Sequence, residues 1–126
     1  MKIIRWETPL SDLPRLFFFG LKDDGPTLRC QFSDGNGAFT NVLIENCGPY
    51  MVSNEEYLIH YWNLKKRGDG WTAIVLDSPL LALYADVIDR QAARHYLFAT
   101  FDTCLEVISE FPPKFIGHAE TFLPPV

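Results

Sequence analysis

The chain has 126 residues, of which 48% are hydrophobic, 14% aromatic and 21% charged. This length suits a single domain spanning 1–126, and the apolar content is too high for a disordered chain. The net charge of −5 argues against a nucleic-acid partner, because phosphate binding needs concentrated Lys and Arg, and it fits a basic protein partner.

Cysteine usage and the N-terminal sequence indicate where the protein resides. Cys30, Cys47 and Cys104 are odd in number and have neither the spacing of a zinc site nor the density of a disulfide scaffold. The first residues lack the apolar core of a signal peptide, and no apolar run approaches the length of a membrane span. We therefore expect a cytoplasmic protein with no membrane contact.

The first part of the chain predicts strands. A short strand is expected over 2–6, and an aromatic strand is expected over 15–21, ended by a turn at 22–26. Because the three phenylalanines at 17–19 cannot all face one way, one side of that strand needs a cover. The second helix, the tail or another chain would supply it, and another chain would be a partner or a second copy in a homodimer.

A half-buried strand is predicted over 27–33, where apolar and polar residues alternate. The residues on its two faces are Leu28, Cys30 and Phe32, expected inward, and Arg29 and Gln31, expected to face water. The sequence Asp-Gly-Asn-Gly at 34–37 predicts a tight hairpin turn, followed by a return strand over 38–46. We expect the Cys-Gly-Pro run at 47–49 to break the chain.

A helix is predicted over 54–67. Ser53 and Glu56 have the spacing of a capping box, and apolar residues recur on one side of the segment. The aromatic and branched residues at 57–62 would also suit a strand.

A β-prone run at 71–76 is followed by a second predicted helix. Asp77 or Ser78 can cap this helix, with Pro79 at its first position. The buried side of the helix should consist of Leu80, Leu81, Leu83, Tyr84 and Val87.

The stretch 94–110 predicts two strands folded back on each other at Asp102 and Thr103. Both faces of the first strand are apolar, so this strand should lie inside a sheet with cover above and below. A turn at that point places His95 opposite Glu110. Such a pair is more often a sheet-edge ion pair than a catalytic dyad.

Together these elements predict an α+β fold, with a mostly antiparallel sheet of about five or six strands and two helices in a single domain. Hairpins separated by helices do not follow the regular alternation of a parallel α/β fold. The tail 114–126 carries apolar side chains and should pack along the body.

The sequence holds no motif for catalysis, metal binding or a cofactor, so we predict none of these. His60, His95 and His118 lack metal-type spacing, and no glycine-rich phosphate loop occurs. Cys30 or Cys47 could meet His60 in space as a nucleophile pair, although small buried thiols more often pack as apolar residues.

The run Ser-Pro-Leu-Leu at 78–81 follows a predicted strand, and the run at 94–102 continues into Leu-Glu-Val-Ile at 105–108. In these features the chain resembles the C-terminal half of small bacterial proteins grouped with polymorphic-toxin immunity proteins. The resemblance implies a cytoplasmic, non-enzymatic protein that binds and blocks one cognate toxin. It carries over no catalytic residue.

Two classes of function therefore fit the sequence. The first is a non-enzymatic binding protein that neutralises a basic toxin domain through acids in turn or helix-start positions. These acids are Asp23, Asp24, Asp34, Glu55 and Glu56. The alternative is a small enzyme or ligand-binding domain with a pocket between sheet and helices, using Trp62, His60 or a cysteine. A deep cleft where histidine and carboxylates or cysteine converge would favour the alternative.

Overall fold

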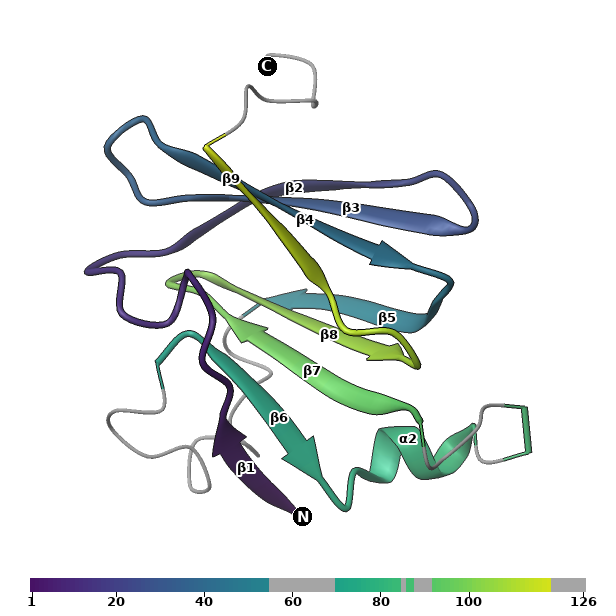
Figure 1. The fold of residues 1–126 in the computed structure, drawn as a ribbon. Helices are drawn as coiled ribbons and strands as arrows, with labels where there is room; N and C mark the ends of the chain where they lie inside the picture. The colour runs from purple at the N-terminus through teal and green to yellow at the C-terminus, as the bar shows by residue number, and fades with distance from the viewer. Residues whose placement is uncertain (55–69, 85, 88–91, 119–126) are drawn as a thin grey trace.

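The structure, a computed structural model, describes residues 1–54, 70–84, 86–87 and 92–118. The strands of this part form two antiparallel sheets (Figure 1). The order in the five-stranded sheet is β1 (Lys2–Arg5), β6 (Thr72–Leu76), β7 (Arg94–Ala99), β8 (Thr103–Ser109) and β5 (Cys47–Asn54). The order in the four-stranded sheet is β2 (Phe17–Asp23), β3 (Thr27–Ser33), β4 (Phe39–Glu45) and β9 (Lys114–His118). A short helix, α2 (Pro79–Leu83), follows β6.

This architecture corrects the predicted fold. The sequence predicts one sheet with two helices, whereas the described residues form two sheets and a single short helix. The prediction of mostly antiparallel pairing is confirmed. The other predicted helix, 54–67, lies outside the described residues apart from Asn54, which ends β5.

Strand β5 runs through 47–49, where the sequence predicts a break. Its pairing with β8 shifts register between Cys47 and Tyr50, which marks an irregularity of the bulge type around Pro49. Among the described strands, β5 is also the last one of its sheet. Proline is tolerated at edges and bulges because no ladder hydrogen bond is lost there. The predicted break is therefore wrong.

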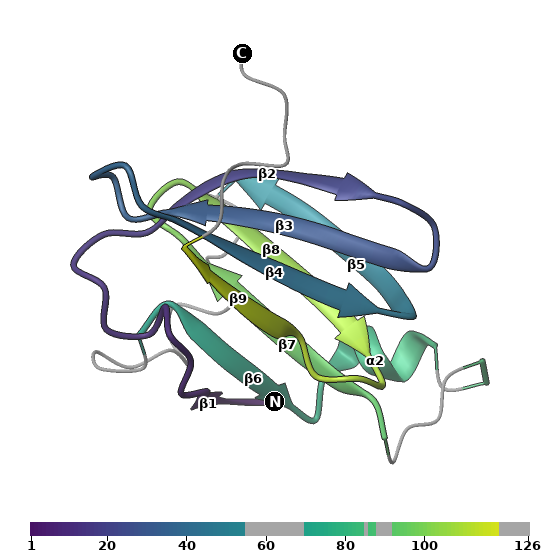
Figure 2. The same ribbon diagram turned by 45° about the horizontal axis from the view of Figure 1, so that its top comes forward.

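The core lies between the two sheets. Figure 2, turned by 45°, brings the four-stranded sheet in front of the five-stranded one. Phe32 of β3 and Phe98 of β7 are fully buried, and their rings stack with centroids 5.2 Å apart. The predicted inward face of β3 is confirmed, since Leu28, Cys30 and Phe32 are at most 1% exposed.

The outer face of the four-stranded sheet is less exposed to water at Gln31 than predicted. Gln31, expected to face water, is fully buried, and its Nε2 donates a hydrogen bond to Asn41 Oδ1 over 2.7 Å. Burial is tolerated because the amide is satisfied by this partner. In β2, successive side chains alternate between the two faces, so Phe18 points into the core while Phe19 is exposed and packs against Phe39. The pairing with β3 shifts register between Phe18 and Gly20.

The hairpin of β7 and β8 is confirmed, but its register differs by two residues from the predicted one. His95 faces Ile108 instead of Glu110, and Leu97 faces Glu106. The difference arises at the turn, where both the N–H and the hydroxyl of Thr100 donate to Thr103 O. A shift by two residues leaves every side chain on its predicted face, because side chains alternate with a period of two.

Strand β7 lies in the middle of the five-stranded sheet, and residues 95–99 are all buried, which confirms the prediction of an interior strand. Tyr96 and Phe98 face the four-stranded sheet. The other face of the five-stranded sheet carries a second apolar cluster. This cluster consists of Ile3, Ala73, Val75, Leu97, Ala99 and Cys104.

Helix α2 starts as predicted and ends earlier. Ser78 is its N-cap and Pro79 its first residue, but the helix stops at Leu83, where the N–H of Tyr84 closes the last turn onto Leu81 O. The predicted buried side is wrong, because no residue of α2 is buried, and Leu83 and Val87 are each 78% exposed.

Candidate functional site

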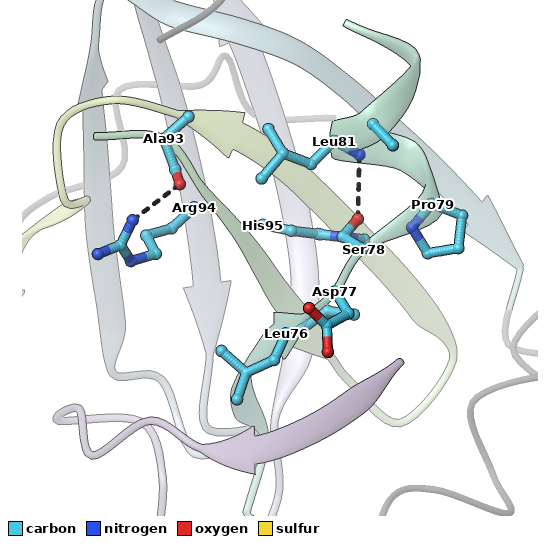
Figure 3. A pocket seen from close by; sticks show the side chains of 10 residues that line it. Leu76, Asp77, Ser78, Pro79, Leu81, Ala93, Arg94 and His95 are labelled. Atoms are coloured by element: carbon cyan, nitrogen blue, oxygen red, sulfur yellow. Dashed lines mark hydrogen bonds between the residues drawn. The ribbon is translucent and has the colours of Figure 1, made fainter. Parts of the chain in front are cut away.

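A cavity of about 520 Å³ lies where β6 ends, α2 begins and β7 begins (Figure 3). Its walls combine apolar side chains with a hydroxyl, an imidazole and two charged groups. The lining residues that matter for its chemistry are Leu76, Asp77, Ser78, Leu81, Arg94 and His95.

The turn from β6 into α2 places Ser78 in the wall of this cavity. Asp77 adopts a left-handed backbone conformation with φ of 51°, which Asp tolerates better than most residues. Ser78 is extended, and Pro79 has the fixed φ that suits the first helical position. The backbone N–H of Leu81 donates to Ser78 Oγ over 3.0 Å, so this oxygen is held in one place.

Ser78, His95 and Glu106 form a continuous hydrogen-bonded chain. Ser78 Oγ lies 2.6 Å from His95 Nδ1, and His95 Nε2 lies 3.0 Å from Glu106 Oε1. The exposed fractions of the three residues are 6%, 0% and 2%. We refer to these three residues as the Ser78 relay.

The sheet register brings the relay together. In β7, His95 and Leu97 point to the same face, and Glu106 of β8 stands directly opposite Leu97. Glu106 is therefore the diagonal neighbour of His95. On the other side, His95 pairs with Val75 of β6, three residues before Ser78. The serine thus reaches the imidazole from the neighbouring strand.

The relay has one consistent assignment of protons when the carboxylate is ionised. A carboxylate can only accept, so His95 Nε2 must carry the hydrogen that Glu106 receives. In a neutral imidazole the other nitrogen is then an acceptor, and the Ser78 hydroxyl donates to Nδ1. Ser78 Oγ is therefore polarised by a base that a buried acid orients.

The acids predicted to contact a partner are spread over the four-stranded sheet. Asp23 and Asp24 lie at the turn between β2 and β3, whereas Asp34 lies at the turn between β3 and β4, at the opposite end of β3. Glu55 and Glu56 lie outside the described residues. The structure thus places only Asp23 and Asp24 side by side.

Each of the three described acids has a local partner. Asp23 accepts from the Tyr50 hydroxyl over 2.9 Å, and Asp24 forms an ion pair with Arg29 at 2.9 Å. Asp34 accepts from the backbone N–H of Asn36 and of Ala38, which closes its turn. Asp34 therefore shapes its own turn.

The cysteines are poor nucleophile candidates. Burial raises the pKa of the Cys30 thiol to about 12, and burial together with the Asp23 carboxylate raises that of Cys47 to about 11. Both thiols are therefore protonated at neutral pH, and the thiolate is the reactive form. The predicted partner His60 lies outside the described residues.

Sequence reasoning misses the acid of the relay. The predicted pair of His95 with Glu110 is wrong, because the observed register brings Glu106 to the imidazole. A signal was present, since Glu106 is the only charged residue between Thr103 and Ser109 in a strand that is otherwise buried. For Ser78 the sequence predicts only a helix cap.

Comparison with protein-family models, curated proteins and solved structures finds no match to the chain. These comparisons neither support nor contradict the resemblance to immunity proteins. Within the part of the chain that is described, no group of three or more His, Cys, Asp or Glu side chains could hold a metal ion. No helix there is long and apolar enough to cross a membrane.

Proposed function

We propose that the protein binds a small organic ligand in the cavity beside α2. The observation that carries this proposal is the polarised hydroxyl of Ser78 in the wall of a cavity of about 520 Å³. Ligand sites typically have volumes of roughly 300–1,000 Å³, with mostly apolar walls and a few fixed polar groups. This is the alternative function expected from the sequence, with different polar residues.

The lining indicates a ligand with one polar end and a small apolar body. Ser78 presents its hydroxyl oxygen from a buried arrangement in which it is hydrogen-bonded to His95, so little entropy is lost when it binds a ligand. Leu76 and Leu81 supply apolar surface in the same cavity. Asp77 and Arg94 carry opposite charges, so the cavity has no single dominant sign.

Filling the cavity should abolish ligand binding. Ala82 lines the cavity and is exposed, so Ala82→Trp would place an indole there without disturbing the core. We expect small alcohols, amides and carboxylates to bind the unmodified protein with Kd of about 1 mM, near −4 kcal/mol. Amide chemical shifts around Ser78 and His95 should change on titration, and Ala82→Trp should lose these changes.

The matched control is Leu83→Trp, which adds a similar indole to the same helix outside the cavity lining. This variant should bind the probes as the unmodified protein does. Shift changes scattered over both sheets, or changes that survive Ala82→Trp, would contradict binding in the cavity.

We propose protein binding through β5 as a second candidate function, the immunity-type role. The observation that favours it is a run of exposed apolar side chains on this edge strand, with Tyr50 36%, Met51 46% and Val52 41% exposed. Asp23 accepts from the Tyr50 hydroxyl and adds negative charge beside the run. Edge strands offer unpaired backbone groups to a partner, and flanking acids would attract a basic toxin domain.

A substitution in β5 and a control substitution elsewhere test whether β5 is the binding surface. Against a basic toxin domain encoded by a neighbouring gene, Met51→Arg is expected to weaken binding more than tenfold, and raised salt should slow association. Asp34→Asn, at the far end of β3, is the control and should bind normally. Equal binding by Met51→Arg and the unmodified protein in a titration would exclude β5 as the interface.

A further inference from the structure

We propose that Ser78 is a nucleophile for acyl transfer, activated by His95 and Glu106, and that the cavity takes small carboxylic esters. The proposal rests on the proposed ligand-binding function, because the same cavity must admit the ester. It goes further by assigning a reaction to the site.

The geometry is that of a nucleophile, a base and an orienting acid. The hydroxyl and imidazole lie 2.6 Å apart and the imidazole and carboxylate 3.0 Å apart, both within hydrogen-bonding reach. Ser78 lines the cavity (Figure 3), whereas Glu106 does not, so a substrate would meet the oxygen and not the acid. This order is the one that hydroxyl nucleophiles require.

A purely structural role explains less of the arrangement. A helix cap needs only Ser78 Oγ and the N–H of Leu81, whose 3.0 Å hydrogen bond is satisfied without any histidine. His95 and Glu106 are almost completely buried, and burying ionisable groups is costly. Apolar side chains in place of a buried pair are often neutral or stabilising. A chemical role accounts for keeping both groups in line with the hydroxyl.

The reaction balances with the residues present and the ester. Ser78 Oγ attacks the carbonyl carbon, the C=O electron pair moves to oxygen, and the hydroxyl proton passes to His95 Nδ1. The imidazolium is stabilised by Glu106 at Nε2. Collapse expels the alkoxide, which takes the proton from Nδ1 and leaves as an alcohol. Water then repeats the sequence on the acyl-serine, which releases the carboxylic acid and restores Ser78.

The roles of the two imidazole nitrogens follow from the fold. Nδ1 faces the serine and Nε2 faces the acid, the reverse of the arrangement in the chymotrypsin-type triad. Either nitrogen can accept the proton when the other one is held by an acid, so the relay works in this orientation. The hydrogen bond from Leu81 uses one lone pair of Ser78 Oγ and leaves the second for attack.

Covalent labelling tests the assignment. The full chain is treated with a fluorophosphonate, in which serine oxygen attacks phosphorus and fluoride leaves, and the adduct is mapped by peptide mass spectrometry. We expect one adduct, on Ser78, absent in Ser78→Ala. His95→Gln should slow labelling by about 100-fold or more, because general-base assistance typically contributes 10²–10⁴-fold. Slow hydrolysis of p-nitrophenyl acetate should follow the same pattern.

Ser109→Ala is the matched control, since Ser109 is a buried serine whose hydroxyl donates to Phe111 O instead of a histidine. It should be labelled at the normal rate. If His95→Gln does not fold by circular dichroism, Glu106→Gln replaces it, with labelling slowed but not abolished. No adduct on Ser78 in the folded protein, or equal labelling rates with and without His95, would overturn the nucleophile. If alcohols and amides still bind the cavity, only the reaction fails and the proposed ligand-binding function stands.

Discussion

Replacing Glu106 by alanine is expected to lower the free energy of unfolding by about 1–3 kcal/mol. The carboxylate is 2% exposed and accepts from the fully buried imidazole of His95 at 3.0 Å. Its removal takes away the acceptor that Glu106 provides for the Nε2–H of His95, and a buried donor that loses an acceptor is not compensated by water. Urea denaturation followed by circular dichroism measures the change.

Two further variants separate charge from packing. Glu106→Gln keeps the shape and an acceptor oxygen, so its loss should be smaller than that of Glu106→Ala. The double variant with His95→Leu and Glu106→Leu removes both polar groups, and it should recover much of the loss because replacing both partners of a buried hydrogen bond by apolar groups can be nearly neutral. A loss below about 1 kcal/mol for Glu106→Ala would mean that the hydrogen bond between His95 and Glu106 does not stabilise the folded protein.

Phe98→Ala should lower the free energy of unfolding by about 3–5 kcal/mol, because it opens a cavity between the two sheets. Phe98 is fully buried and stacks on Phe32 of the facing sheet at 5.2 Å. Its ring also lies 5.6 Å from Trp6 and 6.4 Å from Phe115. One ring therefore contacts both layers, and the surrounding aromatic side chains cannot close the gap without moving apart from each other.

The matched control is Phe101→Ala, three residues further along the same hairpin. Phe101 is 64% exposed and packs against Phe17 at 5.7 Å, so its loss should change the free energy of unfolding by about 0.5 kcal/mol or less. Chemical denaturation of both variants with unchanged m-values makes the comparison valid. Similar losses for the two variants would show that the core does not lie where the sheets face each other.

Local patterns predict much of this fold. Alternation in β3 identifies its inward face, and the apolar residues of β7 identify an interior strand. Strands near 2–6, 15–21 and 71–76, and the start of α2, also follow from residue type. The apolar tail packs on the body as far as 118, where β9 pairs with β4. Each of these features depends on neighbours in sequence.

What local patterns miss depends on contacts between distant residues. The hairpin register is set by Thr100, whose hydroxyl binds Thr103 O, and turn propensity alone places the reversal one residue too late. Strand β5 forms by antiparallel pairing with β8, and the shift in register between Cys47 and Tyr50 accommodates Pro49. Side-chain burial on the outer face, as at Gln31, depends on the amide of Asn41 ten residues away.

The candidate site also depends on contacts between residues that are distant in the sequence. Ser78, His95 and Glu106 come from a turn and two strands, and no spacing in the sequence links them. Only the correct register places Glu106 beside His95, and only the turn at Asp77 brings Ser78 to Nδ1. The residues are visible in the sequence as a cap, an apparent edge histidine and an isolated acid, but their association requires the tertiary structure.

The order of strands also governs how fast the chain can fold. Strand β1 pairs with β6 about seventy positions away, and β4 pairs with β9 across a similar distance, so the closing steps of both sheets join remote parts of the chain. Closing loops of that size costs conformational entropy before the strand pairings can form and stabilise the sheets. Folding on the order of milliseconds to seconds is typical of such topologies. The adjacent hairpins β2–β3–β4 and β7–β8, with their short closures, are the natural nuclei from which it would begin.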